Sequence, residues 1–144
     1  MAQYVFDLRR VTVSISNAVI RGGAGENDYI KITPNEPRFK DKIGQDGSWT
    51  SVKNHNRTAR FELTLLSGAE GNQILSSLIK NDYYRPNGAG IGPFLVKDLE
   101  NGIVISGTCR LTDEPEIAFN NSVPEMVWKG TIDQLVISFN GPPA

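Results

Sequence analysis

Two side chains of this sequence could take part in nucleophilic or acid–base chemistry. His55 is the only histidine, and it lies in a polar Asn-His-Asn-Arg stretch that is typical of a surface turn. Ser48 and Ser51 are close to it in sequence, but a hydroxyl and an imidazole do not make a triad without a group that orients the base. Cys109 is the only cysteine and lies in an apolar run, where a thiol is usually a small core residue. We expect no catalytic residues, and no enzyme.

Two further motifs could bind a ligand. Residues Asp113–Glu116, together with Glu125, could offer carboxylates to Ca²⁺, but they lack the alternating Asp/Asn ligands and the glycine of a known calcium loop. We expect a solvated acidic turn instead. Gly88–Gly92 has the glycines of a dinucleotide loop, yet it precedes an apolar strand rather than a helix. One His and one Cys also do not make a zinc site. The sequence therefore predicts no metal and no cofactor.

The stretch Thr58–Leu111 predicts a strand, a helix and a hairpin in that order. Apolar residues alternate with polar ones from Thr58 to Leu66, which indicates a half-buried strand. Ser67–Glu70 has capping-box spacing, and apolar residues then recur at helical intervals up to Asn81 and Asp82. Phe94–Asp98 and Ile103–Leu111 flank Glu100–Gly102, which would supply the positive-φ residues of a tight hairpin turn.

Strand patterns are also present before this stretch. Alternation from Val11 predicts an early strand that continues toward Ile20 and is broken by Arg21–Gly25. Tyr29–Thr33 predicts a short strand that Pro34 stops. Trp49–Val52 predicts a strand that pairs with the Thr58 strand in a hairpin across Asn54–Asn56.

The segment Pro34–Ser48 is polar and contains two prolines and a Gly-Gln-Asp-Gly turn. It has no residues for a core, so we expect a long loop that is mobile in the free subunit and becomes ordered on assembly.

In the last predicted strand the apolar residues change from even-numbered to odd-numbered positions. Met126, Trp128, Gly130 and Ile132 would face inward on even positions, whereas Leu135, Ile137 and Phe139 put the apolar set on odd positions. A β-bulge or bend near Asp133-Gln134 must absorb one residue. A strand that changes sheets at a sandwich corner accounts for this pattern. Alternatively, one half packs on its own core while the other joins the sheet of a neighbouring subunit.

Composition indicates a single all-β domain, residues 1–144. Hydrophobic residues make up 39% and charged residues 22%, and 14 Gly and 8 Pro indicate many turns. The net charge of −1 gives no strong electrostatic reason to bind a phosphate backbone. A lone cysteine cannot form an internal disulfide, which is consistent with synthesis in a reducing cytosol. The sequence shows neither a Sec signal nor a membrane-spanning apolar run, so we expect no membrane anchoring.

Several short motifs share one order along nearly the whole chain. They are Gly44–Gly47 ahead of a strand, Leu65–Gly68 running into Asn72–Leu75, Lys97-Asp98 before a glycine turn, and a closing Val136–Gly141. In this order and spacing the sequence resembles the tail tube proteins of contractile-tailed bacteriophages, a family long described only as phage structural proteins of unknown function.

The resemblance implies an antiparallel β-sandwich or barrel of the tail tube type that assembles into a homo-hexameric ring. Rings would stack into a hollow inner tube in the tail of the virion, after synthesis in the cytoplasm of the bacterial host. The implied partners are the tail sheath protein, baseplate and tail terminator proteins, the tape measure protein, and DNA that passes through the lumen without tight binding.

Other functional classes explain these sequence features less completely. An isolated binding β-sandwich would explain the missing active site but not the resemblance, and a hydrolase would explain neither. A baseplate or tail terminator ring of the same fold, or the inner tube of a secretion or tailocin apparatus, are the alternatives that stay open. The residues expected to make inter-subunit contacts are Lys40, Asp41, Lys42, Asp46, Gly47 and Trp49.

Overall fold

The computed structural model describes residues 11–21, 29–85, 88, 90–98 and 102–140. These residues form strands and one helix, and their strand pairs are antiparallel, which confirms the predicted all-β class. In chain order the elements are β1 (Val11–Ile15), β2 (Ala18–Ile20), β3 (Ile30–Pro34), β4 (Phe39–Ile43), β5 (Trp49–Lys53), β6 (Ala59–Leu66), α1 (Gly71–Tyr84), β7 (Gly92–Asp98), β8 (Ile103–Asp113) and β9 (Glu125–Phe139).

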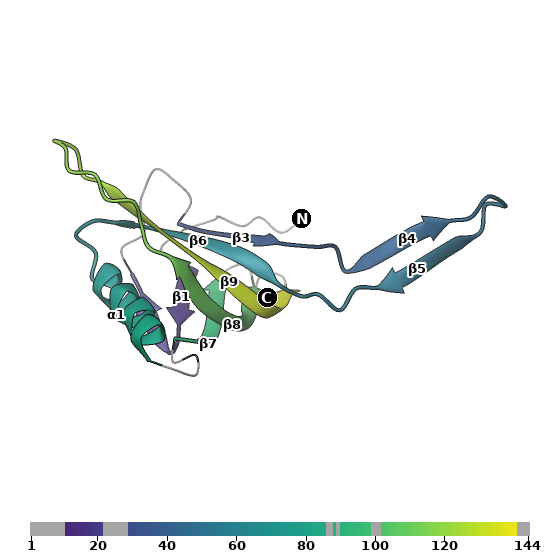
Figure 1. Ribbon diagram of the computed structural model, residues 1–144, viewed down its shortest axis with the longest axis horizontal. Coiled ribbons are helices and arrows are strands. Elements are labelled where there is room, and N and C mark those ends of the chain that lie inside the picture. The colour runs from purple at the N-terminus through teal and green to yellow at the C-terminus, as the bar shows by residue number, and fades with distance from the viewer. Residues whose placement is uncertain (1–10, 22–28, 86–87, 89, 99–101, 141–144) are drawn as a thin grey trace.

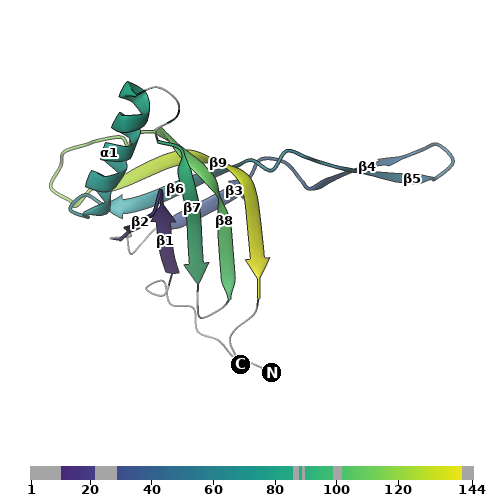
Figure 2. The same ribbon diagram turned by 90° about the horizontal axis from the view of Figure 1, so that it is seen from below.

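Seven strands form one sheet in the order β2-β1-β7-β8-β9-β6-β3, and β4 and β5 form a separate hairpin that projects from the body (Figure 1). The sheet folds over on itself. In Figure 2, β1, β7, β8 and the end of β9 lie side by side along one axis, while β3, β6 and the start of β9 lie across them. The two halves enclose the core, where the ring centroids of Phe61 from β6 and Phe94 from β7 lie 5.2 Å apart.

Alternation along β6 is confirmed except at Thr64. Ala59, Phe61, Leu63 and Leu65 are buried and Arg60 and Glu62 are exposed, but Thr64, expected on the outer side, is buried as well. Phe61 pairs with Gly130 of β9, and a methyl group on Gly130 would overlap both the Phe61 ring and the carbonyl oxygen of Arg110. Glycine at this position therefore lets the aromatic ring lie directly on the backbone of the neighbouring strand.

The predicted helix is present as α1, two residues longer than expected, but its predicted capping box is wrong. Glu70 is the N-cap residue, and its side chain makes no capping hydrogen bond. Asn72 links the start of the helix to its surroundings instead, because its Nδ2 donates to the carbonyl oxygen of Leu66 at 2.8 Å and its Oδ1 accepts from Nε1 of Trp128 at 2.9 Å. The helix start is fixed by contact with β6 and β9 rather than by its own first turn.

The predicted hairpin between Phe94–Asp98 and Ile103–Leu111 is confirmed as β7 and β8. Gly102 has the expected positive φ, 70°. The other two turn residues, Glu100 and Asn101, lie outside the described residues, as does most of the expected break at Arg21–Gly25.

Two of the strand predictions are wrong. The early strand does not continue toward Ile20, because Ser16 and Asn17 adopt positive φ angles of 52° and 69° and turn the chain so that β2 pairs back on β1. Two consecutive residues in this conformation make the type of turn that suits a tight hairpin.

The second error concerns Trp49–Val52, which does not pair with β6. It forms β5 and pairs with β4, with Ile43 opposite Trp49 and Phe39 opposite Lys53. The segment read as a long loop therefore contains a strand, Phe39–Ile43. Its predicted lack of core residues is confirmed, since all of β4 and β5 is exposed.

The parity change in β9 is confirmed as a bulge. Ser106 pairs with Val136 and Thr108 with Asp133, so two residues of β9 lie opposite Gly107 alone. Gln134 has φ 56°, and its backbone N–H donates to Oδ1 of Asp133 at 2.8 Å. Leu135 is buried after the bulge, but Ile137 and Phe139 are 39% and 75% exposed, so the odd-numbered set does not face the core along its whole length.

Replacing Gly130 with Ala should lower the free energy of unfolding by about 1–3 kcal/mol, because the methyl group displaces the Phe61 ring from the strand. Gly68→Ala is the matched control, since a methyl group there would contact nothing within 4 Å. Urea unfolding followed by circular dichroism measures both variants. Equal stability of the two would contradict the packing described for Phe61.

Candidate assembly surfaces

The β4–β5 arm (Phe39–Lys53) is a two-stranded ribbon that extends away from the sheet into solvent (Figure 1). Directly paired residues share a face of a ribbon. Ile43 and Trp49 therefore lie on one face together with Phe39, and Lys40 and Lys42 lie on the other. Trp49 and Ile43 are each 70% exposed. The arm thus has an apolar face and a basic face, both open to solvent in the single chain.

The tip of the arm is a tight turn. The backbone N–H of Gly44 donates to the carbonyl oxygen of Ser48 at 2.8 Å, and Gly47 has φ 84°. Ser48 donates to Oδ1 of Asp46 from its hydroxyl and its backbone N–H, and these bonds lower the pKa of Asp46. The turn fixes the register of the ribbon, but an isolated two-stranded hairpin is only marginally stable in water.

All six predicted contact residues lie on this arm. Lys40 and Lys42 are on the basic face, Asp41 and Trp49 are on the apolar face, and Asp46 and Gly47 are in the turn. Sequence reasoning missed Phe39 and Ile43, which form the apolar face with Trp49. The alternation in Phe-Lys-Asp-Lys-Ile was the signal, because it places both apolar residues on the same side of a strand.

The base of the arm is held to β9. Nη2 of Arg38 donates to the carbonyl oxygen of Leu135 at 2.7 Å, and the N–H of Leu135 donates to the carbonyl oxygen of Arg57 at 3.0 Å. Glu36 accepts from Nδ2 of Asn54 at 2.9 Å, and this bond, with the positive charge of Lys40, lowers the pKa of Glu36. The direction of the arm is thereby tied to the body at the point where β9 bends.

Beyond this point β9 has an open edge. Its pairing with β6 ends at Ile132, so Asp133–Phe139 pairs with β8 alone. Backbone groups of alternate residues point to the same side of a strand. The N–H and carbonyl oxygen of Leu135 point away from β8, so those of Ile137 and Phe139 point away from it too. Within the described residues, no strand forms hydrogen bonds with these groups of Ile137 and Phe139. This open edge can pair with a strand from another chain.

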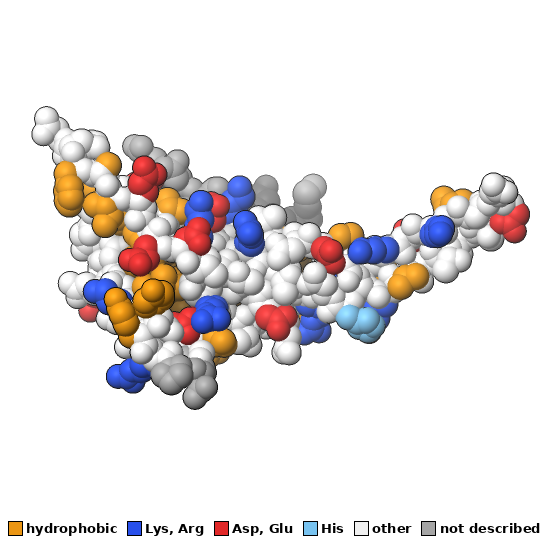
Figure 3. Space-filling view, viewed as in Figure 1, with side chains coloured by type: hydrophobic (Ala, Val, Ile, Leu, Met, Phe, Trp, Pro, Cys, Tyr) orange, Lys and Arg blue, Asp and Glu red, His pale blue; other side chains and the backbone are white. Residues whose placement is uncertain are grey.

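A second projection lies at the opposite end of the molecule (Figure 1). The β8–β9 extension (Glu114–Pro124) carries apolar side chains that project into solvent, with Phe119 95%, Val123 69% and Ile117 61% exposed. In Figure 3, orange side chains gather on this projection and also along the arm. Acidic residues within the extension and beside it are Asp113, Glu114, Glu116 and Glu125. It is therefore acidic as well as apolar.

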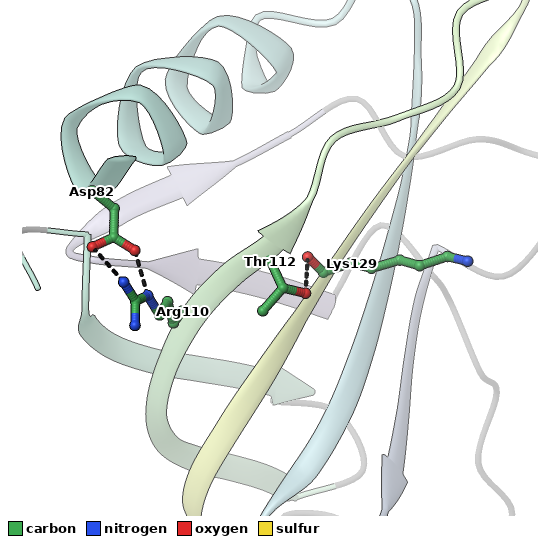
Figure 4. Close-up of polar contacts among 4 residues, drawn as sticks. All are labelled: Asp82, Arg110, Thr112 and Lys129. Atoms are coloured by element: carbon green, nitrogen blue, oxygen red, sulfur yellow. Dashed lines mark hydrogen bonds and ion pairs between the residues drawn. The ribbon is translucent and has the colours of Figure 1, made fainter. Parts of the chain in front are cut away.

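An open groove of about 810 Å³ lies between the end of α1 and β8, lined in part by Tyr83, Tyr84 and Glu114. At its floor Arg110 donates from Nε and Nη2 to the two carboxylate oxygens of Asp82 (Figure 4). This pair, with a further bond from the N–H of Gly90, lowers the pKa of Asp82. Asp82 is only 8% exposed, so the carboxylate depends on these donors.

The residues considered for chemistry are not assembled into a site. His55 is exposed in the segment between β5 and β6, and Cys109 is 2% exposed in the core, where burial raises its pKa to about 12. Among the described residues, no group of three or more His, Cys, Asp or Glu side chains is arranged to hold a metal ion. The helix found in those residues is too short to cross a bilayer.

No family model matches the chain, and no curated protein matches it by sequence. Solved structures do share its fold. A chain from the structure of the anti-feeding prophage cap, a tube-terminating cap, matches with a TM-score of 0.61 and 10% identity over 96% of this chain and 94% of its own. A chain from the sheath/tube terminator of an extracellular contractile injection system, PVC, matches with a TM-score of 0.61 and 12% identity over 96% and 99%.

A third chain comes from the sheath-tube complex of the same injection system in its extended state. It matches with a TM-score of 0.62 and 12% identity over 95% of this chain and 93% of its own. The structural likeness extends over nearly the full length of both chains in each comparison. At these identities the likeness shows a shared fold.

Arg110→Ala should lower the free energy of unfolding at pH 7 by about 1–3 kcal/mol, because it leaves a nearly buried carboxylate without its main donor. The hydrogen bond from Arg110 lowers the pKa of Asp82 below its usual 3.8. Its contribution to the free energy of unfolding is therefore complete above pH 3.8 and is lost as the pH falls through the lower pKa that Asp82 has in the folded state. The cost of the substitution should therefore shrink toward pH 3. Urea unfolding at both pH values measures it, with Asp82→Asn as the background control; an equal cost in both backgrounds would contradict the pairing.

Proposed function

We propose that this protein is the structural subunit of the inner tube of a contractile tail, built from hexameric rings that stack. The observation that carries the proposal is an unfinished sheet: among the described residues, β9 leaves the edge of Ile137 and Phe139 open, and the same sheet ends at β2 on its other side. A subunit with two open strand edges can form the missing backbone hydrogen bonds at both by pairing head to tail with its neighbours. Such a contact closes into a ring when the rotation from one subunit to the next divides a full turn evenly.

Six copies arranged in this way would form a continuous barrel around a channel. The backbone groups that a single chain leaves to water would then be paired across each subunit boundary. The exposed apolar face of the arm needs a cover as well, and contact with an adjacent ring would supply it. Lys40, Asp41, Lys42, Asp46, Gly47 and Trp49 would make that contact. The shared fold with chains from tube, cap and terminator structures supports this role without distinguishing among them.

The proposed tube conducts DNA and does not grip it. Each Lys or Arg paired with a phosphate would release counterions and add affinity, which would slow the passage of a genome. A net charge of −1 is consistent with a lumen that lacks a strongly basic lining. The tail sheath, baseplate, tail terminator and tape measure proteins are the remaining proposed partners, and the location is the phage tail, after synthesis in the host cytoplasm.

A second candidate is a terminator or baseplate ring, or the inner tube of a secretion or tailocin apparatus. It is favoured by two of the similar structures, a tube-terminating cap and a sheath/tube terminator of an injection system. The purified proteins would differ in how they self-assemble. Rings of a tube subunit stack without limit, whereas a terminator forms a single ring and stops.

Negative-stain electron microscopy and light scattering of the purified chain test the proposed function. Rings should form first and long tubes at tens of micromolar, a range in which weak assemblies become populated. Single rings at every concentration would favour the terminator. A stable monomer throughout would contradict both.

Ile137→Pro should abolish ring formation and leave the fold intact. The N–H of Ile137 faces the open edge, so proline removes a donor needed by the neighbour and none that bonds to β8. Val136→Pro is the contrasting variant, because its N–H faces β8 and its loss should lower the stability of the single chain. Sedimentation velocity and thermal unfolding report the two effects; normal rings from Ile137→Pro would refute pairing at this edge.

Replacing Phe39–Lys53 with Asn-Gly should give folded rings that do not stack. Arg38 and Asn54 are already joined by a backbone hydrogen bond of 2.7 Å, so a two-residue turn can close the chain there. No residue of the arm lies in the core, and the melting temperature should change little. Tubes of normal length from this variant, seen in negative stain, would show that the arm does not connect rings.

A further inference from the structure

The arm and the β8–β9 extension have complementary surfaces. Each carries exposed apolar side chains, which monomeric proteins seldom gather on narrow projections. On one face of the arm these are Phe39, Ile43 and Trp49, with Val52 on the other face, and on the extension they are Ile117, Phe119 and Val123. None of these side chains belongs to the hydrophobic core. Each therefore presents an apolar surface that a partner could remove from water.

Their charges are opposite. The arm and its base have more basic than acidic side chains, with Arg38, Lys40, Lys42, Lys53 and Arg57 against Glu36, Asp41 and Asp46. The extension and its flanks have the reverse, with Asp113, Glu114, Glu116 and Glu125 against Lys129. A two-stranded ribbon is only one layer thick, so lysines of its basic face also contribute to the potential at its apolar face. Opposite potentials of this kind select a partner and set its orientation.

The two projections lie at opposite ends of the long axis of the molecule (Figure 1), and both views place them far apart (Figure 2). One chain cannot bring its own arm and extension together, so the partner must be another molecule. A contact between two different patches of the same chain repeats from copy to copy and produces an open-ended assembly if it does not close. This is the property that stacking of rings requires.

We propose that the β8–β9 extension of a subunit in one ring is the docking site for the β4–β5 arm of a subunit in the next ring. Phe119, the most exposed of the apolar side chains, packs on the face formed by Phe39, Ile43 and Trp49. Glu114 and Glu116 face the basic side chains of the arm. The inference deepens the proposed function, on which it depends, by naming the surface that receives the arm. It also gives the stack a direction, because the two ends of each ring differ.

A charge-exchange experiment on the full chain tests it. Lys40→Glu/Lys42→Glu on the arm and Glu114→Lys/Glu116→Lys on the extension should each raise the concentration needed for stacking by roughly tenfold or more, since each places like charges at the contact. Rings should still form. Combining the four substitutions should restore stacking toward that of the unchanged chain. Lys97→Glu, at an exposed position of β7 outside both projections, is the control for a charge reversal away from the contact.

The apolar part of the contact has its own variant. Phe119→Ser should weaken stacking without lowering the melting temperature, because its side chain is 95% exposed in the single chain. Tube length in negative stain and sedimentation velocity are the measurements. Tubes that form normally in all variants, or a combined variant that is no better than either parent, overturn the inference while the tube function stands. Loss of the rings themselves places the contact within a ring and also overturns it. Failure of the unchanged chain to form rings refutes the proposed function instead.

Discussion

The bulge at Asp133-Gln134 is the constraint on which the rest of the structure depends. Before it, β9 lies between β8 and β6 and buries Trp128 and Ile132; after it, β8 is the only strand among the described residues that pairs with β9. The extra residue changes which side of the strand faces the core, and the positive φ of Gln134 bends the chain. One strand can therefore serve both halves of the folded sheet.

The same bend creates the surfaces that point to assembly. Because β6 and β9 separate there, the backbone beyond Leu135 is left without a neighbour on one side. Arg38 and Arg57 occupy the first position of that edge, and through them the arm is anchored where the edge begins. An open edge and an exposed arm are unfavourable for a single chain in water, and both become favourable when other copies cover them.

Much of the body could be predicted from the sequence, because its patterns are local. Alternation in β6, the apolar period of α1 and the glycine turn between β7 and β8 each determine a short segment by itself. The parity change in β9 is also visible within one strand. Which strands pair with each other was harder to predict, and the wrong partner strand predicted for Trp49–Val52 shows why. Phe39 and Ile43 do alternate with lysines, but the ribbon packs on no core, so this alternation did not identify a neighbouring strand and Phe39–Ile43 was read as loop.

The assembly surfaces were only partly predictable for a related reason. Five of the six predicted contact residues belong to Pro34–Ser48, which was chosen for its length and polarity, and the sixth, Trp49, begins the strand predicted after it; all six lie on the arm. The apolar face of Phe39 and Ile43 and the extension around Phe119 depend on which residues end up side by side or at opposite ends of the fold. That information comes from the long-range pairing of β4 with β5 and of β8 with β9.

Amide hydrogen exchange, resolved by residue in the free and the assembled protein, tests the central claim most directly. The amides of Val136 and Ser138 point toward β8 and should be protected in both states, which makes them internal references. Those of Ile137 and Phe139 should exchange much faster in the dilute subunit and become protected on assembly. Protection of Ile137 and Phe139 in the dilute single chain, or rapid exchange that persists in assembled protein, would contradict an edge completed by a neighbouring subunit.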